Sequence, residues 1–80
     1  MINSLWTEVC VFKKVRRGCV YDVFRVYTNE LGWCKCHRER SGKDMYINSL
    51  DALNTVIAAL KKIRFRCVSG ELPERVVSRF

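Results

Sequence analysis

The chain has 80 residues, in which 15 Lys and Arg stand against 8 Asp and Glu, so its formal net charge is +7. A chain of this length supports a single core, and residues 1–80 are predicted to form one small domain. No run reaches the roughly 18 consecutive apolar residues of a membrane span, and the first residues lack the regions of an export signal. These patterns predict a cytoplasmic protein without a membrane partner, and the positive charge favours anionic partners.

The strands are predicted from alternating apolar and polar residues. A first strand covers residues 5–15, and a three-residue turn at 16–18, with Gly18 in the left-handed conformation, leads to a second strand at 19–28. Turn-forming residues then separate the second strand from a third at 33–40.

The register of the third strand is predicted from the faces of the sheet. Pairing Tyr27 with Trp33 keeps the apolar side chains of both strands together, whereas a shift by one residue would mix Trp33 and Lys35 into that set. A further turn at 41–44 leads to a short fourth strand at 45–47.

Residues 49–66 carry the strongest helix signal in the chain. Asn48 or Ser49 can cap the first turn, and basic residues crowd the last turn, which suits the helix dipole. Leu72 and Pro73 are typical of the start of a short C-terminal helix. The predicted fold is therefore α+β: a four-stranded antiparallel meander, one long helix packed on one face, and a short C-terminal helix. The helix stripe consists of Leu50, Leu53, Val56, Ile57, Leu60 and Ile63.

The two faces of this sheet have different compositions. The face toward the helix is predicted to hold Trp6, Cys10, Phe12, Phe24, Val26, Cys34, Cys36, Met45 and Ile47. The second face is predicted to hold Val9, Val11, Val15, Tyr21, Val23, Tyr27, Trp33 and Tyr46, interrupted by Lys13, Arg25, Lys35 and His37. A sheet face left to water is mostly polar, so either the C-terminal segment or a partner is expected to cover the second face.

No catalytic, metal or cofactor site is predicted. Cys34 and Cys36 share a face, but His37 points the other way, with Val23 as its expected neighbour, so Cys-Lys-Cys-His does not converge on one ion. The five cysteines are odd in number and follow no export signal, which favours buried free thiols over disulfides. Asp22 is expected to pair with Arg38 across the strands. The sequence shows no glycine-rich phosphate loop and no acid/base pair of carboxylates, so we predict that the protein is not an enzyme.

Basic residues gather at the first hairpin, along the third strand and at the end of the helix. With Tyr21, Tyr27 and Trp33, the first two groups are typical of a surface where bases stack on rings and phosphates meet cations. The candidate phosphate contacts are Lys13, Lys14, Arg16, Arg17, Arg38, Arg40 and Lys43. The alternative interpretation is a solvated surface that keeps a small protein soluble.

Three stretches, Trp33-Cys34-Lys35-Cys36, Ile47-Asn48-Ser49-Leu50-Asp51-Ala52-Leu53 and Ala58-Ala59-Leu60, carry a resemblance. Between Trp33 and about Arg64 the chain resembles a family of short, uncharacterised bacterial domains. Those domains have antiparallel strands and a final helix entered through Ser-Leu-x-Ala-Leu. The resemblance implies the fold and no activity. In size and in its lack of catalytic residues, the chain also resembles small phage or mobile-element inhibitors, including anti-CRISPR proteins.

The leading hypothesis from the sequence is a non-enzymatic interaction protein that binds and occludes a surface of a protein or ribonucleoprotein partner. Aromatic and arginine residues usually dominate such interfaces. The expected partner-binding residues are Tyr21, Arg25, Tyr27, Trp33 and Lys35. Two alternatives stay open: direct binding of RNA or single-stranded DNA by the same face and the basic turns, and a homodimer that buries the face, with its function elsewhere.

Overall fold

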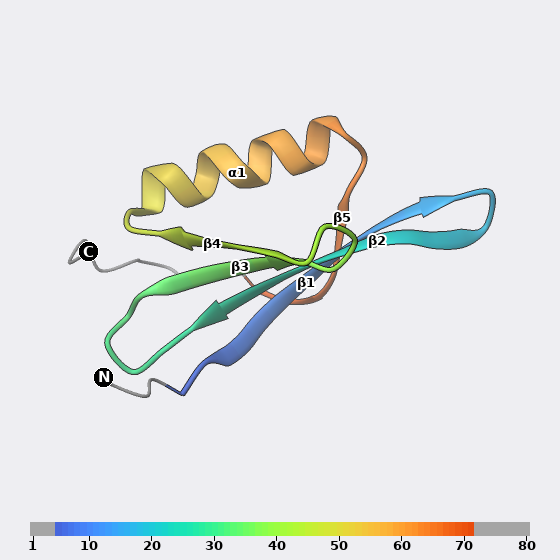
Figure 1. The fold of residues 1–80 in the computed structure, drawn as a ribbon. Helices are drawn as coiled ribbons and strands as arrows, with labels where there is room; N and C mark the ends of the chain where they lie inside the picture. Colours follow the sequence, from blue (N-terminus) through green and yellow to red (C-terminus); the bar gives the residue numbers. More distant parts are fainter. Residues whose placement is uncertain (1–4, 72–80) are drawn as a thin grey trace.

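The computed structural model describes residues 5–71, which form an α+β domain as predicted. Five antiparallel strands lie in the order β4-β3-β2-β1-β5, and the helix covers one face of the sheet (Figure 1). The helix follows the edge strand β4 in the chain and leads to the opposite edge strand β5, so it connects the two edges of the sheet. The elements are β1 (Thr7–Arg16), β2 (Cys19–Thr28), β3 (Cys34–Arg38), β4 (Lys43–Ile47), α1 (Leu50–Lys62) and β5 (Arg66–Gly70).

The prediction of four strands is wrong, because α1 ends earlier than expected and leaves β5 free to pair with β1. Arg64 has a left-handed φ of 71°. Its N–H donates to the carbonyl oxygen of Lys61 at 3.1 Å, and the N–H of Phe65 donates to that of Leu60 at 2.9 Å. This pair of bonds is the Schellman arrangement that ends a helix. The short helix predicted to begin near Leu72 lies outside the described residues.

The hairpin between β1 and β2 has a tighter turn than predicted. Arg16 pairs with Cys19, so the loop is Arg17-Gly18, with φ values of 52° and 77°. Positive φ at both positions is the geometry of a two-residue turn, which matches the twist of the flanking strands.

The register of β3 differs from the prediction by two residues. Tyr27 pairs with Lys35, not with Trp33. The reason is the turn at Asn29, whose Oδ1 accepts hydrogen bonds from the N–H groups of Leu31 and Trp33, both at 3.0 Å. Trp33 therefore belongs to the turn. A shift by two residues keeps every side chain on its face, so the predicted faces still hold for β3 and for β2 from Asp22 onward. Before Asp22, the extra residue at Tyr21 interrupts the alternation of β2.

The core lies between α1 and the sheet. Ser49 caps the helix as predicted, and its Oγ accepts a hydrogen bond from the N–H of Ala52 at 3.0 Å. The buried core residues are Cys10, Phe12, Phe24, Val26, Cys34, Cys36, Ile47, Leu53, Ile57, Leu60 and Phe65.

Two predictions about the start of the first strand are wrong: Trp6 does not belong to the core face, and Val9 packs against the core instead of lying on the second face. Glu8 pairs with Tyr27 and Cys10 with Val26, so Val9 is an extra residue in β1. Such a bulge interrupts the alternation of the strand. Trp6 consequently lies on the second face, with its ring centroid 6.0 Å from that of Tyr46.

We predict that Gly70→Ala lowers the free energy of unfolding by at least about 2 kcal/mol. Gly70 has a φ of 75°, and a Cβ there would lie 1.9 Å from the carbonyl oxygen of Val9, so β5 would have to move away from β1. Gly42→Ala is the matched control. Gly42 has a φ of 70°, but a Cβ there meets nothing within 4 Å. Its loss should stay near about 1 kcal/mol. Equal losses in urea unfolding would contradict the close approach of β5 to β1.

Candidate partner-binding surface

Four side chains gather at one end of the second face: one comes from the residue before β1, and the others come from β2, β3 and β4. Lys35 pairs with Tyr27 on one side and with Tyr46 on the other. Its Nζ lies 5.0 Å from the ring centroids of both Trp6 and Tyr27, which is within cation–π range. Tyr46 is 58% exposed. We call Trp6, Tyr27, Lys35 and Tyr46 the aromatic patch.

The aromatic patch contains two of the five predicted partner-binding residues, Tyr27 and Lys35. Trp33 is half-buried in the turn before β3. Tyr21 lies near the start of β2, six residues before Tyr27, which is about 20 Å along a strand. The structure therefore divides the predicted site into two separate places.

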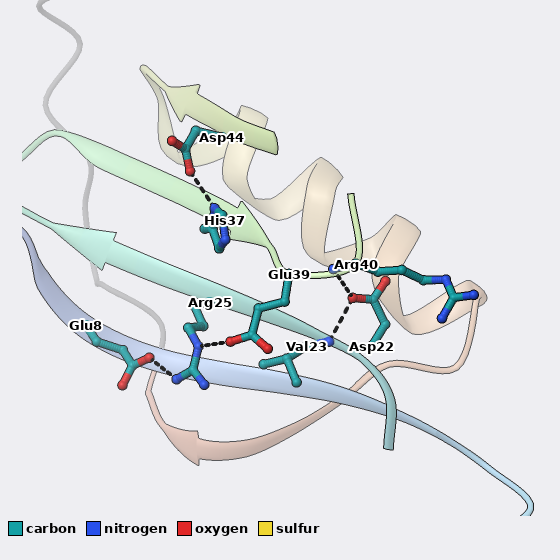
Figure 2. A network of polar contacts seen from close by, with 8 residues as sticks. All are labelled: Glu8, Asp22, Val23, Arg25, His37, Glu39, Arg40 and Asp44. Atoms are coloured by element: carbon teal, nitrogen blue, oxygen red, sulfur yellow. Dashed lines mark hydrogen bonds and ion pairs between the residues drawn. The ribbon is translucent and has the colours of Figure 1, made fainter. Parts of the chain in front are cut away.

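Arg25 is tied to two carboxylates of its own chain. Its Nη1 lies 2.6 Å from Oε1 of Glu8 and its Nε lies 2.7 Å from Oε1 of Glu39, as Figure 2 shows. These two hydrogen bonds raise the pKa of Arg25 above its usual value. A guanidinium bound by two carboxylates has fewer N–H donors left for a partner. Arg25 instead links β2 to β1 and to the residue that follows β3.

The second face is less apolar than the sequence predicts. Val11 and Val23 lie on it but are buried. His37 lies between Arg25 and Asp44 in the register rather than beside Val23, and its Nδ1 is 2.7 Å from Oδ1 of Asp44 (Figure 2). Polar pairs thus fill the middle of the face, and the aromatic side chains are left at one end.

The pair of Asp22 and Arg38, expected from the sequence, is present. The Asp22 side chain is fully buried and its Oδ2 accepts a hydrogen bond from Nε of Arg38 at 2.6 Å. Its Oδ1 accepts from the N–H groups of Val23 and Arg40, at 2.8 and 3.1 Å (Figure 2). Burial acts to raise the pKa of Asp22, but these hydrogen bonds outweigh it, and the pKa lies below its usual value.

The predicted phosphate contacts fall into two kinds of surroundings. Arg38 is paired with Asp22. Lys13 lies directly opposite Arg66 of β5, and like charges in that position repel. In residues 5–71, the other predicted contacts have no carboxylate within ion-pairing distance. These are Lys14, Arg16, Arg17, Arg40 and Lys43.

Three of the five cysteines are core thiols, and the prediction of buried thiols is wrong for Cys19 and Cys67. Cys10, Cys34 and Cys36 are buried, while Cys19 and Cys67 are exposed, and all five are free. Burial raises the pKa of Cys10 to about 12, and neighbouring thiols add to this effect. Residues 5–71 contain no group of three or more side chains that could hold a metal ion.

The fold and this surface define a small basic α+β protein with an aromatic patch on the sheet face opposite the helix (Figure 1). The C-terminal segment that was expected as one possible cover of this face lies outside the described residues. The chain matches no known protein family, no curated protein and no solved structure. Within residues 5–71, no helix has the length and apolar composition needed to cross a membrane.

Trp6 is the patch residue that sequence reasoning missed. The signal was present in the apolar run from Val9 to Phe12, where strict alternation fails. A break in alternation is the mark of a bulge, and a bulge moves every residue before it to the opposite face.

We predict that only Cys19 and Cys67 react rapidly with 5,5′-dithiobis(2-nitrobenzoate) in the folded protein. The reaction requires an accessible thiolate, and the other three thiols are inaccessible because they are buried. The control is the same measurement in urea, where all five should react. Rapid reaction of a third thiol under native conditions would contradict the buried placement.

We predict that the stability of the protein falls as the pH drops from about 5 to below 3, and that Asp22→Asn removes much of this fall. The folded-state pKa of Asp22 is lower than the unfolded value, so the stabilisation is present above the unfolded pKa and is lost as the pH falls through the folded pKa. At pH 7 the variant should lose about 2 kcal/mol, because it weakens a charged hydrogen bond. Urea unfolding of both proteins at pH 7 and pH 3 measures the difference. Parallel losses on acidification would contradict the role of Asp22.

Proposed function

We propose that the protein is a non-enzymatic interaction protein that binds and occludes a surface of a protein or ribonucleoprotein partner through the aromatic patch. The observation that carries the proposal is the arrangement of Lys35 between the rings of Trp6 and Tyr27, next to the exposed ring of Tyr46. The one helix of the described chain packs on the opposite face, so it leaves this group open (Figure 1).

The chemistry of the aromatic patch suits a protein surface. Large rigid rings bring contact area at a low cost in side-chain entropy, and tyrosine and tryptophan are enriched among residues that dominate binding energy. The cation–π contacts and the strand pairing hold these side chains before a partner arrives, which lowers the cost of ordering them. The small size and the absence of a predicted catalytic site fit occlusion, as in phage or mobile-element inhibitors of the anti-CRISPR kind.

We predict that the double variant Tyr27→Ser/Tyr46→Ser lowers the affinity for the partner by at least about tenfold, since it removes two central rings. The partner is first captured from a lysate on the immobilised wild-type protein, and its dissociation constant is then measured with purified components. The control is Val68→Ser, which removes a side chain that is 54% exposed on β5, away from the patch. Unchanged capture by the double variant, with its fold intact by circular dichroism, would contradict the proposal.

A homodimer is the competing outcome, and sedimentation equilibrium distinguishes it. If the wild-type protein is a dimer and Tyr27→Ser/Tyr46→Ser is a monomer, a second copy occupies the aromatic patch and the proposal is wrong. A further readout uses Trp33→Phe, which leaves Trp6 as the only tryptophan of the chain. Its emission should shift to the blue when the partner covers the patch.

A further inference from the structure

We propose that the tip of the β1–β2 hairpin is a second binding site, for single-stranded nucleic acid, built on Tyr21 and the cations around it. The site is separate from the aromatic patch and does not rest on the proposed function. The hairpin projects beyond the helix, so its tip stands clear of the core (Figure 1).

Three cations from two parts of the chain surround one ring. The guanidinium carbon of Arg40, in the turn between β3 and β4, lies 3.9 Å from the centroid of Tyr21. That of Arg16, at the end of β1, lies 4.3 Å away, and Nζ of Lys14 lies 5.6 Å away. All three distances are within cation–π range. The ring therefore collects positive charge from β1 and from the β3–β4 turn.

This charge is not balanced by the described chain. Arg25 and Arg38 each have a carboxylate partner, but residues 5–71 place none within ion-pairing distance of Lys14, Arg16 or Arg40. Arg16 and Arg40 cannot be farther apart than the sum of their distances to the Tyr21 centroid. That limit is close to the Debye length of about 8 Å at physiological salt, so the two charges repel each other. An anionic ligand would relieve this repulsion.

The backbone conformation of the hairpin turn also supports a binding role for this site. Arg17 has a φ of 52°, a conformation that glycine and asparagine adopt far more readily than arginine. The turn therefore gains nothing locally from an arginine. What Arg17 adds is a third guanidinium at the exposed tip, next to Arg16.

Arg40 is held in place before any ligand binds. Its N–H donates to Oδ1 of the buried Asp22 at 3.1 Å, and its Nη1 lies 3.4 Å from the carbonyl oxygen of Tyr21. Asp22 in turn is bound by Arg38. These contacts fix the β3–β4 turn against β2, and a site fixed in this way binds with a smaller entropic cost.

The combination of planes and charges selects nucleic acid over an acidic protein surface. Carboxylates need only cations, whereas single strands offer phosphates for the guanidinium donors and flat bases that stack on aromatic rings and guanidinium planes. Arg16 and Arg40 are both exposed, so a base can reach their guanidinium groups. Duplexes keep their bases stacked internally, so the stacking part of the site favours single strands.

The test is fluorescence anisotropy with a fluorescein-labelled 12-nucleotide RNA of mixed sequence, titrated at several salt concentrations. For Arg16→Gln/Arg40→Gln, we predict a dissociation constant raised about tenfold and a log–log salt slope reduced by about 1.4, which is about 0.7 for each lost contact with a single-stranded phosphate. The control is Lys61→Gln/Lys62→Gln, which removes the same charge from the exposed end of α1 and should change binding less than twofold. Equal losses in both variants, or a flat salt response in the wild-type protein, would overturn the proposal.

Two further variants separate binding from folding. Arg17→Asn introduces a residue that favours the turn, so the melting temperature of the variant should not fall. Its affinity for the RNA should drop about threefold and its salt slope by about 0.7. Tyr21→Phe keeps the ring and should bind as the wild type does, whereas Tyr21→Leu should bind more weakly. Full binding by Arg17→Asn and Tyr21→Leu would overturn the assignment to the tip.

Competitors identify the class of ligand. Unlabelled single-stranded DNA should displace the RNA, whereas a DNA duplex and poly-glutamate of equal total charge should displace it poorly. Equal competition by poly-glutamate would show a surface for acidic proteins, and equal competition by the duplex would remove the stacking argument; either result overturns the assignment. Tyr27→Ser/Tyr46→Ser should bind the RNA normally, so failure of this proposal and failure of the proposed function are distinguishable.

Discussion

The buried carboxylate of Asp22 is the interaction on which much of the described structure depends. Its side chain is fully buried, and it accepts hydrogen bonds from the side chain of Arg38 and from the N–H groups of Arg40 and Val23. An ion removed from water costs several kcal/mol unless its hydrogen bonds are satisfied. The β3–β4 turn must therefore stay where these donors are, and this requirement fixes the end of β3 against β2 and places Arg40 on Tyr21.

Local signals in the sequence were sufficient for the start and the apolar stripe of the helix, and for the faces of β3 and most of β2. The helical stripe and the Ser49 cap depend only on neighbouring residues, and alternation fixes which side chains of β2 and β3 face the core. Alternation cannot fix the register, because Tyr27 opposite Trp33 or opposite Lys35 gives the same faces. The deciding contact is made by the Asn29 side chain, which holds Trp33 in the turn.

The composition of the two candidate sites depends on features that periodicity does not show. An extra residue at Val9 brings Trp6 to the second face, and one at Tyr21 interrupts the pairing of β1 and β2 near the tip. The strand β5 has no alternating pattern, because all of its residues are exposed. Its pairing depends on where the helix ends and on the close approach of Gly70 to the backbone of Val9. These are tertiary constraints, so a sequence alone predicts them poorly.

The positive charges in the middle of the second face and those at the hairpin tip have different surroundings. In the middle of the second face, Arg25 and His37 each contact a carboxylate, as expected for residues that stabilise a fold. At the hairpin tip, Arg16 and Arg40 share one ring, and no carboxylate of residues 5–71 forms an ion pair with either, which costs stability and favours an anion. About 20 Å of strand separates this tip from Lys35 and the aromatic patch. If both proposals hold, a ribonucleoprotein is a class of partner that would contact the aromatic patch with protein and the hairpin tip with single-stranded nucleic acid.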